Sequence, residues 1–230
     1  MLLHGLGLGH RLWQPQFEPL SEHFHVLAPD LPGFARSAAA GPFTISGAAE
    51  QVADLIGAQG RAPAHVCGLS LGALVAIQLG LSVPDRVASL ILSAAQVRPP
   101  PALMWFQKLL FACVPEARLV EGIASDIPTR DESLLAAARE DARLTGKRGL
   151  LQAMGAAGRV DFRAELSRIH APTLVLCGSR DWPNVGATRE LARAIPGASL
   201  RLIPDAGHVW NIEQPELFVD TIREFVDQLH

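Results

Sequence analysis

The stretch Ala64-His-Val-Cys-Gly-Leu-Ser70-Leu-Gly72-Ala-Leu-Val-Ala-Ile-Gln-Leu79 places a serine between a short apolar run and a helical apolar pattern. The run at 65–67 predicts a strand, and the apolar spacing over 71–79 predicts a helix. Gly68 and Gly72 permit a sharp reversal between the two, because a side chain at either position would block it. Such a turn lifts the Ser70 hydroxyl above the sheet, and the amide of Leu71 faces the same spot at a helix N-terminus. The pattern G-x-S-x-G in this context indicates a nucleophile elbow.

Length and composition set the broad class of the protein. A chain of 230 residues suits one α/β domain with an insertion, and 49% hydrophobic against 19% charged residues indicates a globular chain. A net charge of −3 gives no reason to expect nucleic acid or an anionic membrane as a partner. The three cysteines form no C-x-x-C pair, which favours a reducing compartment, and Cys67 and Cys177 end apolar runs typical of core strands.

The N-terminal segment shows neither the basic region nor the apolar region of a signal peptide, and no apolar stretch reaches the length that spans a bilayer. We therefore expect a cytoplasmic protein.

Strand and helix signals alternate along most of the chain. Apolar runs predict strands at 1–3, 24–28, 65–67, 87–92, 172–177 and 199–203, and amphipathic patterns predict helices at 46–59, 71–79, 187–195 and 215–229. This alternation predicts a doubly wound, mostly parallel sheet with crossover helices. Ligands of such sheets bind beyond the carboxyl ends of the strands, which is where Ser70 is expected.

The pattern changes at Val97-Arg-Pro-Pro-Pro101. From there to 160 only helical stretches are visible, at 102–113, 116–124, 131–144 and 147–157, so we expect a helical cap (97–160) inserted into an α/β core (1–96 and 161–230). The first of these stretches is too apolar for one helix face. Its large apolar side chains are predicted to pack on the core, to form an apolar wall of the substrate pocket, or both: Leu103, Met104, Trp105, Phe106, Leu109, Leu110 and Phe111.

A serine hydroxyl needs a base beside it to act as a nucleophile. His208 is the natural candidate because it lies in the loop after the last strand, and His4, in the loop after the first strand, is the nearest rival. The imidazole in turn needs a carboxylate to hold its tautomer. Asp181 follows a strand on the same rim as Ser70, whereas Asp205 has the pattern of a turn residue. The chain order Ser, Asp, His matches that of α/β-hydrolases.

The glycines at 5, 7 and 9 do not complete the G-x-G-x-x-G fingerprint of a dinucleotide loop. A loop that turns a backbone amide toward Ser70 is the better interpretation. His23 and His25 lack further ligands nearby, so neither a metal nor an organic cofactor is expected.

Five segments together resemble the α/β-hydrolase superfamily: His4-Gly-Leu-Gly7, Asp30-Leu-Pro-Gly-Phe34, Gly68-Leu-Ser-Leu-Gly72, Gly178-Ser-Arg-Asp181 and Ala206-Gly-His208. The similarity covers nearly the whole chain and is closest to small capped carboxylesterases and enol-lactone or C–C bond hydrolases. It implies Ser70 as nucleophile, His208 as base and Asp181 as orienting acid. It also implies an oxyanion hole formed by the amides of Leu6 and Leu71. Dehalogenases and epoxide hydrolases of this fold need an aspartate at the elbow, where this chain has serine.

Two positions depart from the pattern of these relatives. Some of them carry the acid after the strand that follows the elbow, where this chain has Ser93-Ala-Ala-Gln96. Relatives also have an antiparallel strand pair before the His-Gly loop, so either this sheet lacks that pair or the natural chain starts earlier. A missing pair would expose a strand edge through which subunits could associate. It would also leave the Leu6 amide near a frayed terminus, which predicts weak activity.

Three functions fit these observations. The first is a serine hydrolase that cleaves a small, mainly apolar carboxylic ester through an acyl-enzyme. The second keeps the same three side chains but opens a lactone or cleaves a C–C bond of a β-diketone-like compound. Basic side chains directed into the pocket would favour an acidic substrate, and the candidates are Arg98, Arg143, Arg148 and Arg159. The third is a ligand-binding or signalling protein of the same fold with little turnover. All three take a small-molecule ligand.

Overall fold

Five parallel strands form the centre of the computed structural model, which describes residues 1–98 and 100–229. Their order in the sheet is their order in the chain, which confirms the predicted parallel sheet: β1 (Leu2–Leu3), β2 (Ala64–Leu69), β3 (Val87–Ser93), β4 (Thr173–Gly178) and β5 (Ser199–Ile203). Gly68 of β2 pairs with Leu3 on one side and Leu92 on the other, and Gly178 of β4 pairs with Ile203. The carboxyl ends of β2, β4 and β5 therefore share one edge of the sheet.

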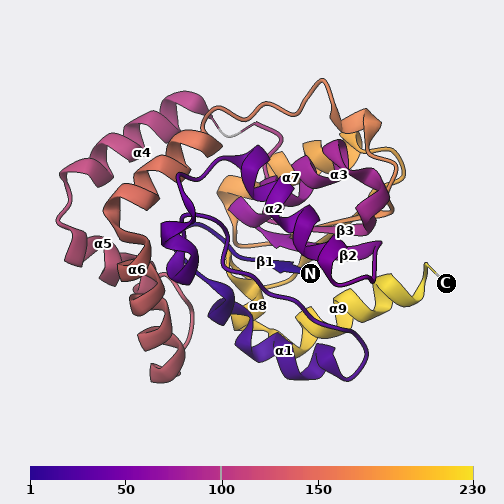
Figure 1. Cartoon of the computed structure of the whole chain (residues 1–230), viewed down its shortest axis with the longest axis horizontal. Coiled ribbons are helices and arrows are strands. Elements are labelled where there is room, and N and C mark those ends of the chain that lie inside the picture. The colour runs from indigo at the N-terminus through magenta and orange to yellow at the C-terminus, as the bar shows by residue number, and fades with distance from the viewer. Residues whose placement is uncertain (99, 230) are drawn as a thin grey trace.

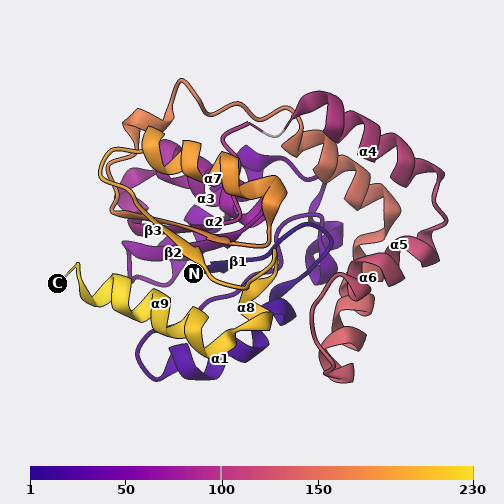
Figure 2. The same cartoon turned by 180° about the vertical axis from the view of Figure 1, so that it is seen from behind.

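Helices cover both faces of this sheet (Figures 1 and 2). One face carries α2 (Ile45–Ala58), α3 (Leu71–Ser82) and α7 (Trp182–Ala194), and the other carries α1 (Gln14–Ser21), α8 (Trp210–Glu213) and α9 (Pro215–Asp227). Short 3₁₀ turns lie at His10–Trp13, Ala35–Ala40, Pro84–Arg86 and Leu166–Arg168. No helix within the described residues is both long and apolar enough to cross a membrane.

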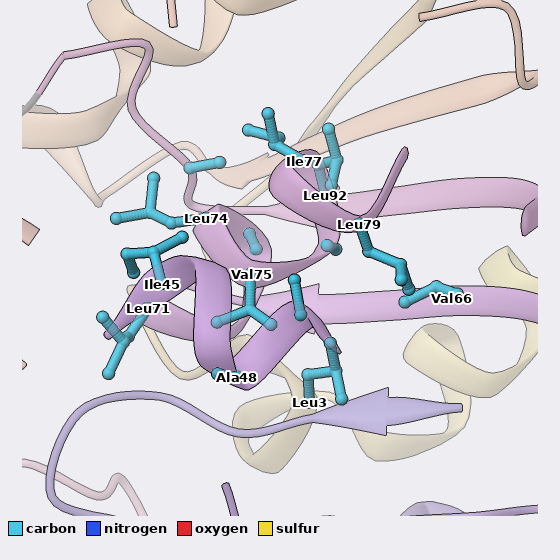
Figure 3. Packing of buried hydrophobic residues seen from close by; sticks show 14 of the residues in the cluster. Leu3, Ile45, Ala48, Val66, Leu71, Leu74, Val75, Ile77, Leu79 and Leu92 are labelled. Atoms are coloured by element: carbon cyan, nitrogen blue, oxygen red, sulfur yellow. The ribbon is translucent and has the colours of Figure 1, made fainter. Parts of the chain in front are cut away.

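The α3 helix is the most deeply buried helix in the core. Its side chains Leu71, Leu74, Val75, Ile77 and Leu79 are at most a few per cent exposed. Figure 3 shows them packed between α2 and the strands β1, β2 and β3. Because α3 is apolar on every side, it fits only between two layers, and this burial holds its first turn against the sheet.

Three further helices lie together on one side of the molecule: α4 (Pro101–Cys113), α5 (Glu116–Ser125) and α6 (Glu132–Ala157) (Figure 1). The sequence predicted all-helical structure here, with a break between 144 and 147. The structure has helical residues on both sides of Gly146, whose φ of 65° and ψ of 164° interrupt α6. Glycine permits this conformation because it has no side chain.

Two predicted elements differ from the structure. Residues 24–28 form no regular strand, although the carbonyl of Leu27 accepts a hydrogen bond of 2.8 Å from the amide of Leu2. The two residues of β1 offer too short a partner for a longer ladder. The α7 helix begins at Trp182, earlier than the predicted start at Ala187. Pro183 lies in its first turn, where a missing N–H costs no helical hydrogen bond.

Candidate active site

Ser70 lies at the turn between β2 and α3. Its φ of 54° and ψ of −110° are rare for a residue with a side chain, and its amide donates to the carbonyl of Ser93 (2.8 Å) on the neighbouring strand β3. A Cβ on Gly68 would overlap the backbone of Gly72, and one on Gly72 would overlap the carbonyls of Leu3 and His4. Close packing on both sides thus holds the serine in its strained position at the carboxyl edge of the sheet.

Asp181 and His208 follow β4 and β5 and meet at the same edge. The carboxylate Oδ2 of Asp181 lies 2.7 Å from Nδ1 of His208, although the two residues are 27 positions apart. The side chain of Asp181 is only 5% exposed, whereas that of His208 is 41% exposed. A buried carboxylate on Nδ1 fixes the orientation of the imidazole and leaves Nε2 for a second partner.

Ser70 and His208 line one cavity of about 320 Å³, which Asn184 also reaches. Within the described residues no hydrogen bond joins the Ser70 hydroxyl to the imidazole. Such bonds are often long before substrate binds and shorten in the reacting complex. The rest of the wall is mostly apolar: Leu6, Leu71, Leu74, Ala94, Pro100, Leu103, Met104, Met154, Ala157 and Pro183, with the amides of Gln96 and Gln107.

Two residues from different segments, Leu6 and Leu71, line this cavity. Leu71 begins α3, so its N–H has no partner within the helix, and Leu6 lies in the loop after β1. Neither amide donates a hydrogen bond to another described residue. Both positions are those predicted for an oxyanion hole.

Two hydrogen bonds of the His4 ring, one accepted and one donated, hold the loop that carries Leu6. The amide of Leu31 donates to His4 Nε2 (2.9 Å), so the proton of the neutral ring is on Nδ1, which donates to the carbonyl of Gly5 (2.9 Å). Burial lowers the pKa of His4 and outweighs the hydrogen bond to Gly5, which acts to raise it. His4 thus braces the loop and is not in contact with Ser70 or Asp181 through any hydrogen bond.

Charged groups hold the C-terminal end of this loop, at His10 and Arg11, in place. The amide of His10 donates to Asp30 Oδ1 (2.7 Å), and its ring Nδ1 lies 2.8 Å from the same oxygen. Burial acts to raise the pKa of Asp30, but these hydrogen bonds outweigh it and lower the pKa below its usual value. Arg11 forms an ion pair with Asp141 of α6. In this structure the Leu6 segment is therefore held at both ends.

Sequence patterns did not identify three polar residues that support the Asp181–His208 pair. Asn184 donates through Nδ2 to both carboxylate oxygens of Asp181 (2.8 and 3.0 Å), and its side-chain oxygen Oδ1 accepts a hydrogen bond from Gln96 Nε2 (2.6 Å). The carboxylate of Glu213 accepts a hydrogen bond from the amide of Gly207 (2.9 Å) and so fixes the loop that carries His208. Only Gln96 had a signal in the sequence, because it lies in the segment after β3 where some relatives carry the acid of the catalytic site.

Asp205, the rival acid, is exposed, and no hydrogen bond or ion pair links it to His208. Its φ of 53° identifies it as the turn residue that the sequence indicated. Among the predicted basic residues, none of Arg98, Arg143, Arg148 and Arg159 lines the cavity that holds Ser70.

The two cysteines predicted to lie in the core are buried. Burial raises the pKa of the Cys67 thiol to about 12 and is the largest cause that raises that of Cys177 to about 11. Both thiols are therefore protonated and unreactive near neutral pH. Within the described residues no cluster of three or more His, Cys, Asp and Glu side chains has the geometry of a metal site.

The Asn184 amide gives a first prediction. Replacing Asn184 with alanine removes both hydrogen bonds to Asp181, and hydrogen bonds to a charged group are strong enough that we expect kcat to fall roughly ten- to a hundredfold. KM should change less, because the change acts through Asp181. Steady-state kinetics and a thermal unfolding curve test this, and an unchanged kcat in a folded variant would contradict a positioning role.

The chain matches the model of the alpha/beta hydrolase family over residues 1–221. It is 32% identical to the pimeloyl-[acyl-carrier protein] methyl ester esterase of Chromobacterium violaceum, over 99% of this chain and 93% of that protein. It is 29% identical to the putative carbamate hydrolase RutD of Yersinia enterocolitica, over 95% of this chain and 83% of that protein.

Among solved structures, the enol-lactonase from Burkholderia xenovorans superimposes with a TM-score of 0.86 at 31% identity, over 98% of this chain and 90% of that one. The named relatives are hydrolases, which favours an enzyme over a ligand-binding protein of the same fold. With its parallel sheet, its serine turn and this match over nearly its whole length, the chain belongs to the alpha/beta hydrolase family and is a hydrolase.

Proposed function

We propose that the protein hydrolyses a small, mainly apolar carboxylic ester through an acyl-enzyme, with Ser70 as nucleophile, His208 as general base and acid, and Asp181 as the orienting carboxylate. The observation that carries this proposal is the cavity around Ser70 and His208. Its wall includes Leu6 and Leu71, whose amides we propose as the oxyanion hole. The wall is otherwise mostly apolar and contains no Lys, Arg, Asp or Glu among the described residues. A volume of about 320 Å³ suits a small ligand.

In the first half of the reaction, Nε2 of His208 takes the proton of Ser70 as the hydroxyl oxygen attacks the ester carbonyl. The negative oxygen that forms lies between the amides of Leu6 and Leu71, which stabilise it. His208 then gives the proton to the departing alcohol, and the acyl group stays on Ser70. Throughout, Asp181 stabilises the imidazolium.

In the second half, a water molecule repeats the attack on the acyl-enzyme. His208 accepts a proton from this water, the tetrahedral intermediate forms between the same two amides, and the proton returns to Ser70 as the carboxylic acid leaves. Each proton taken is returned, so the cycle restores the free enzyme. In this mechanism the helices α4–α6 act as a cap, which is supported by Leu103 and Met104 of α4 and Met154 of α6 lining the cavity that holds Ser70.

A panel of p-nitrophenyl esters tests the substrate class. We expect faster hydrolysis of the butyrate than of an ester of similar length that ends in a carboxylate, since no basic side chain lines the cavity. A preference for the charged ester at equal concentration would contradict the apolar assignment.

Lactone opening is the second candidate, because the enol-lactonase from Burkholderia xenovorans superimposes over nearly the whole chain. The same three side chains would serve, with the alcohol staying attached to the acyl group after the ring opens. Parallel assays of a six-membered lactone and its open-chain ethyl ester distinguish the two. The better substrate by kcat/KM identifies the reaction class.

A further inference from the structure

The helix α4 has the reverse of the usual pattern of a surface helix. At 100° per residue, positions 102, 103, 105, 106, 109, 110 and 113 fall within an arc of about 160°. All of them are apolar or cysteine, and they are exposed. The large side chains Leu103, Trp105, Phe106, Leu109 and Leu110 are between 48% and 67% exposed. Surface helices normally direct such residues to the core and polar ones to water.

The opposite face of α4 carries both polar residues of the helix, Gln107 and Lys108, together with Met104 and Phe111, and it meets the protein. Gln107 lines the cavity of Ser70, and the side chains of Met104 and Lys108 lie against Gly158 and Gly155 of the segment that ends α6. The helix therefore cannot be rotated to bury its apolar arc without directing Lys108 and Gln107 elsewhere. The prediction that the apolar side chains pack on the core is confirmed for Met104 and wrong for the exposed ones: Leu103, Trp105, Phe106, Leu109 and Leu110. Leu103 and Met104 also confirm the alternative, since both line the cavity.

Positive charge gathers beside the arc, although the whole chain carries −3. No Asp or Glu occurs in residues 87–115 or 142–160, and Glu116 is the first acidic residue after α4. Lys108 and Arg159 lie together beside Gly155 and share a groove of about 340 Å³ with Trp105. Lys147 donates to the carbonyls of Ala112 and Val114 at the end of α4 (2.6 and 2.8 Å).

None of Lys108, Lys147 and Arg159 forms an ion pair with an acidic side chain among the described residues. The overall charge predicts no affinity for an anionic surface. Because these three cations gather beside α4, we expect affinity for an anionic surface at this face.

We propose that the exposed apolar arc of α4, with Lys108, Lys147 and Arg159 beside it, docks on an anionic lipid surface. A fluid acyl layer accepts separate protruding side chains without needing a complementary shape, and an indole such as that of Trp105 suits the border between acyl chains and headgroups. The cations meet the negative headgroups. A second copy of the chain would instead bring cations toward cations, which disfavours a dimer through this face.

The docked face adjoins the catalytic cavity. Leu103 belongs both to the arc and to the cavity wall, and Trp182, which is 80% exposed, directly precedes the wall residue Pro183. Docking would therefore bring the mouth of the cavity to the lipid, so that esters dissolved in that phase reach Ser70. This consequence rests on the proposed ester hydrolysis, whereas docking itself does not.

Co-sedimentation of the full chain with sucrose-loaded vesicles tests the proposal independently of catalysis. We expect binding to a phosphatidylcholine–phosphatidylglycerol mixture and much weaker binding to phosphatidylcholine alone. The double variant Lys108→Gln/Arg159→Gln should lose about twenty-five-fold in affinity, since each cation contributes roughly fivefold. Trp105→Ser/Leu109→Ser should lose about tenfold or more because less apolar area is inserted.

The matched control is Phe17→Ser/Leu217→Ser, which removes an exposed aromatic and an exposed leucine side chain (44% and 42%) from α1 and α9, away from α4 (Figures 1 and 2). It should bind as the unmodified chain does. No binding to the anionic vesicles, or an equal loss in the control, would overturn the proposal. A dimer seen by light scattering that Trp105→Ser/Leu109→Ser dissociates, in a chain that does not bind vesicles, would also overturn it. The arc would then be an interface between copies of the chain.

Discussion

The variant Ser70→Ala is expected to lose ester hydrolysis by a factor of about a million, the size seen when a nucleophile that works as a unit with its base is removed. The cavity, the oxyanion amides and the Asp181–His208 contact would remain, because alanine removes only the hydroxyl. A residual rate above that of water is still expected from the amides and from binding. Turnover of p-nitrophenyl butyrate measures the loss.

Labelling by a fluorophosphonate provides a second readout for the same variant. The unmodified chain should gain one label on Ser70, and Ser70→Ala should gain none, as mass spectrometry of the modified peptide would show. Ser82→Ala is the matched control: it lies at the other end of α3, where its hydroxyl donates to the carbonyl of Gln78 (2.7 Å). Equal turnover by Ser70→Ala and the unmodified chain would refute the assignment of the nucleophile.

Asp181→Asn is expected to lower kcat by about four orders of magnitude with little change in the fold. The N–H of an amide in place of the carboxylate donates a hydrogen bond to Nδ1 of His208, where the carboxylate of Asp181 accepts one at 2.7 Å in the unmodified chain. The imidazole then carries its own proton on Nε2 and cannot accept the proton of Ser70. Steady-state kinetics at neutral pH would measure the fall, and circular dichroism would verify the fold.

Asp205→Asn is the matched control for this second prediction. It makes the same chemical change only three residues before His208, at an exposed turn position that asparagine tolerates at positive φ. We expect it to keep the activity of the unmodified chain. A larger loss from Asp205→Asn than from Asp181→Asn would transfer the role of the acid to Asp205.

The sequence predicted the parts of this protein that short segments encode. The turn at Ser70 depends on glycines two residues away on either side, and its backbone geometry is as expected. Asp181 and His208 follow apolar strands, and parallel strands bring their carboxyl ends to one edge. The 2.7 Å contact between them follows from that topology. The helices of 97–160 and the break near Gly146 were also visible in the local pattern.

Only the tertiary structure decided which side chains meet across long stretches of chain. Gln96 and Asn184 are 88 positions apart, and no spacing rule predicts their hydrogen bond. The strand predicted at 24–28 lacks a regular ladder because its partner β1 is only two residues long. The local sequence pattern of a segment cannot show how long the strand that pairs with it will be.

The α4 helix shows the same limit most clearly. Its sequence is apolar on several sides, so periodicity alone does not decide which side chains face the core, the catalytic cavity or the solvent. The packing of Met104 and Lys108 against two glycines near the end of α6 decides it, and this contact also gathers cations from distant segments around an exposed apolar arc. The sequence determines which side chains α4 carries, whereas the packing of α4 against α6 determines which of them form the exposed surface.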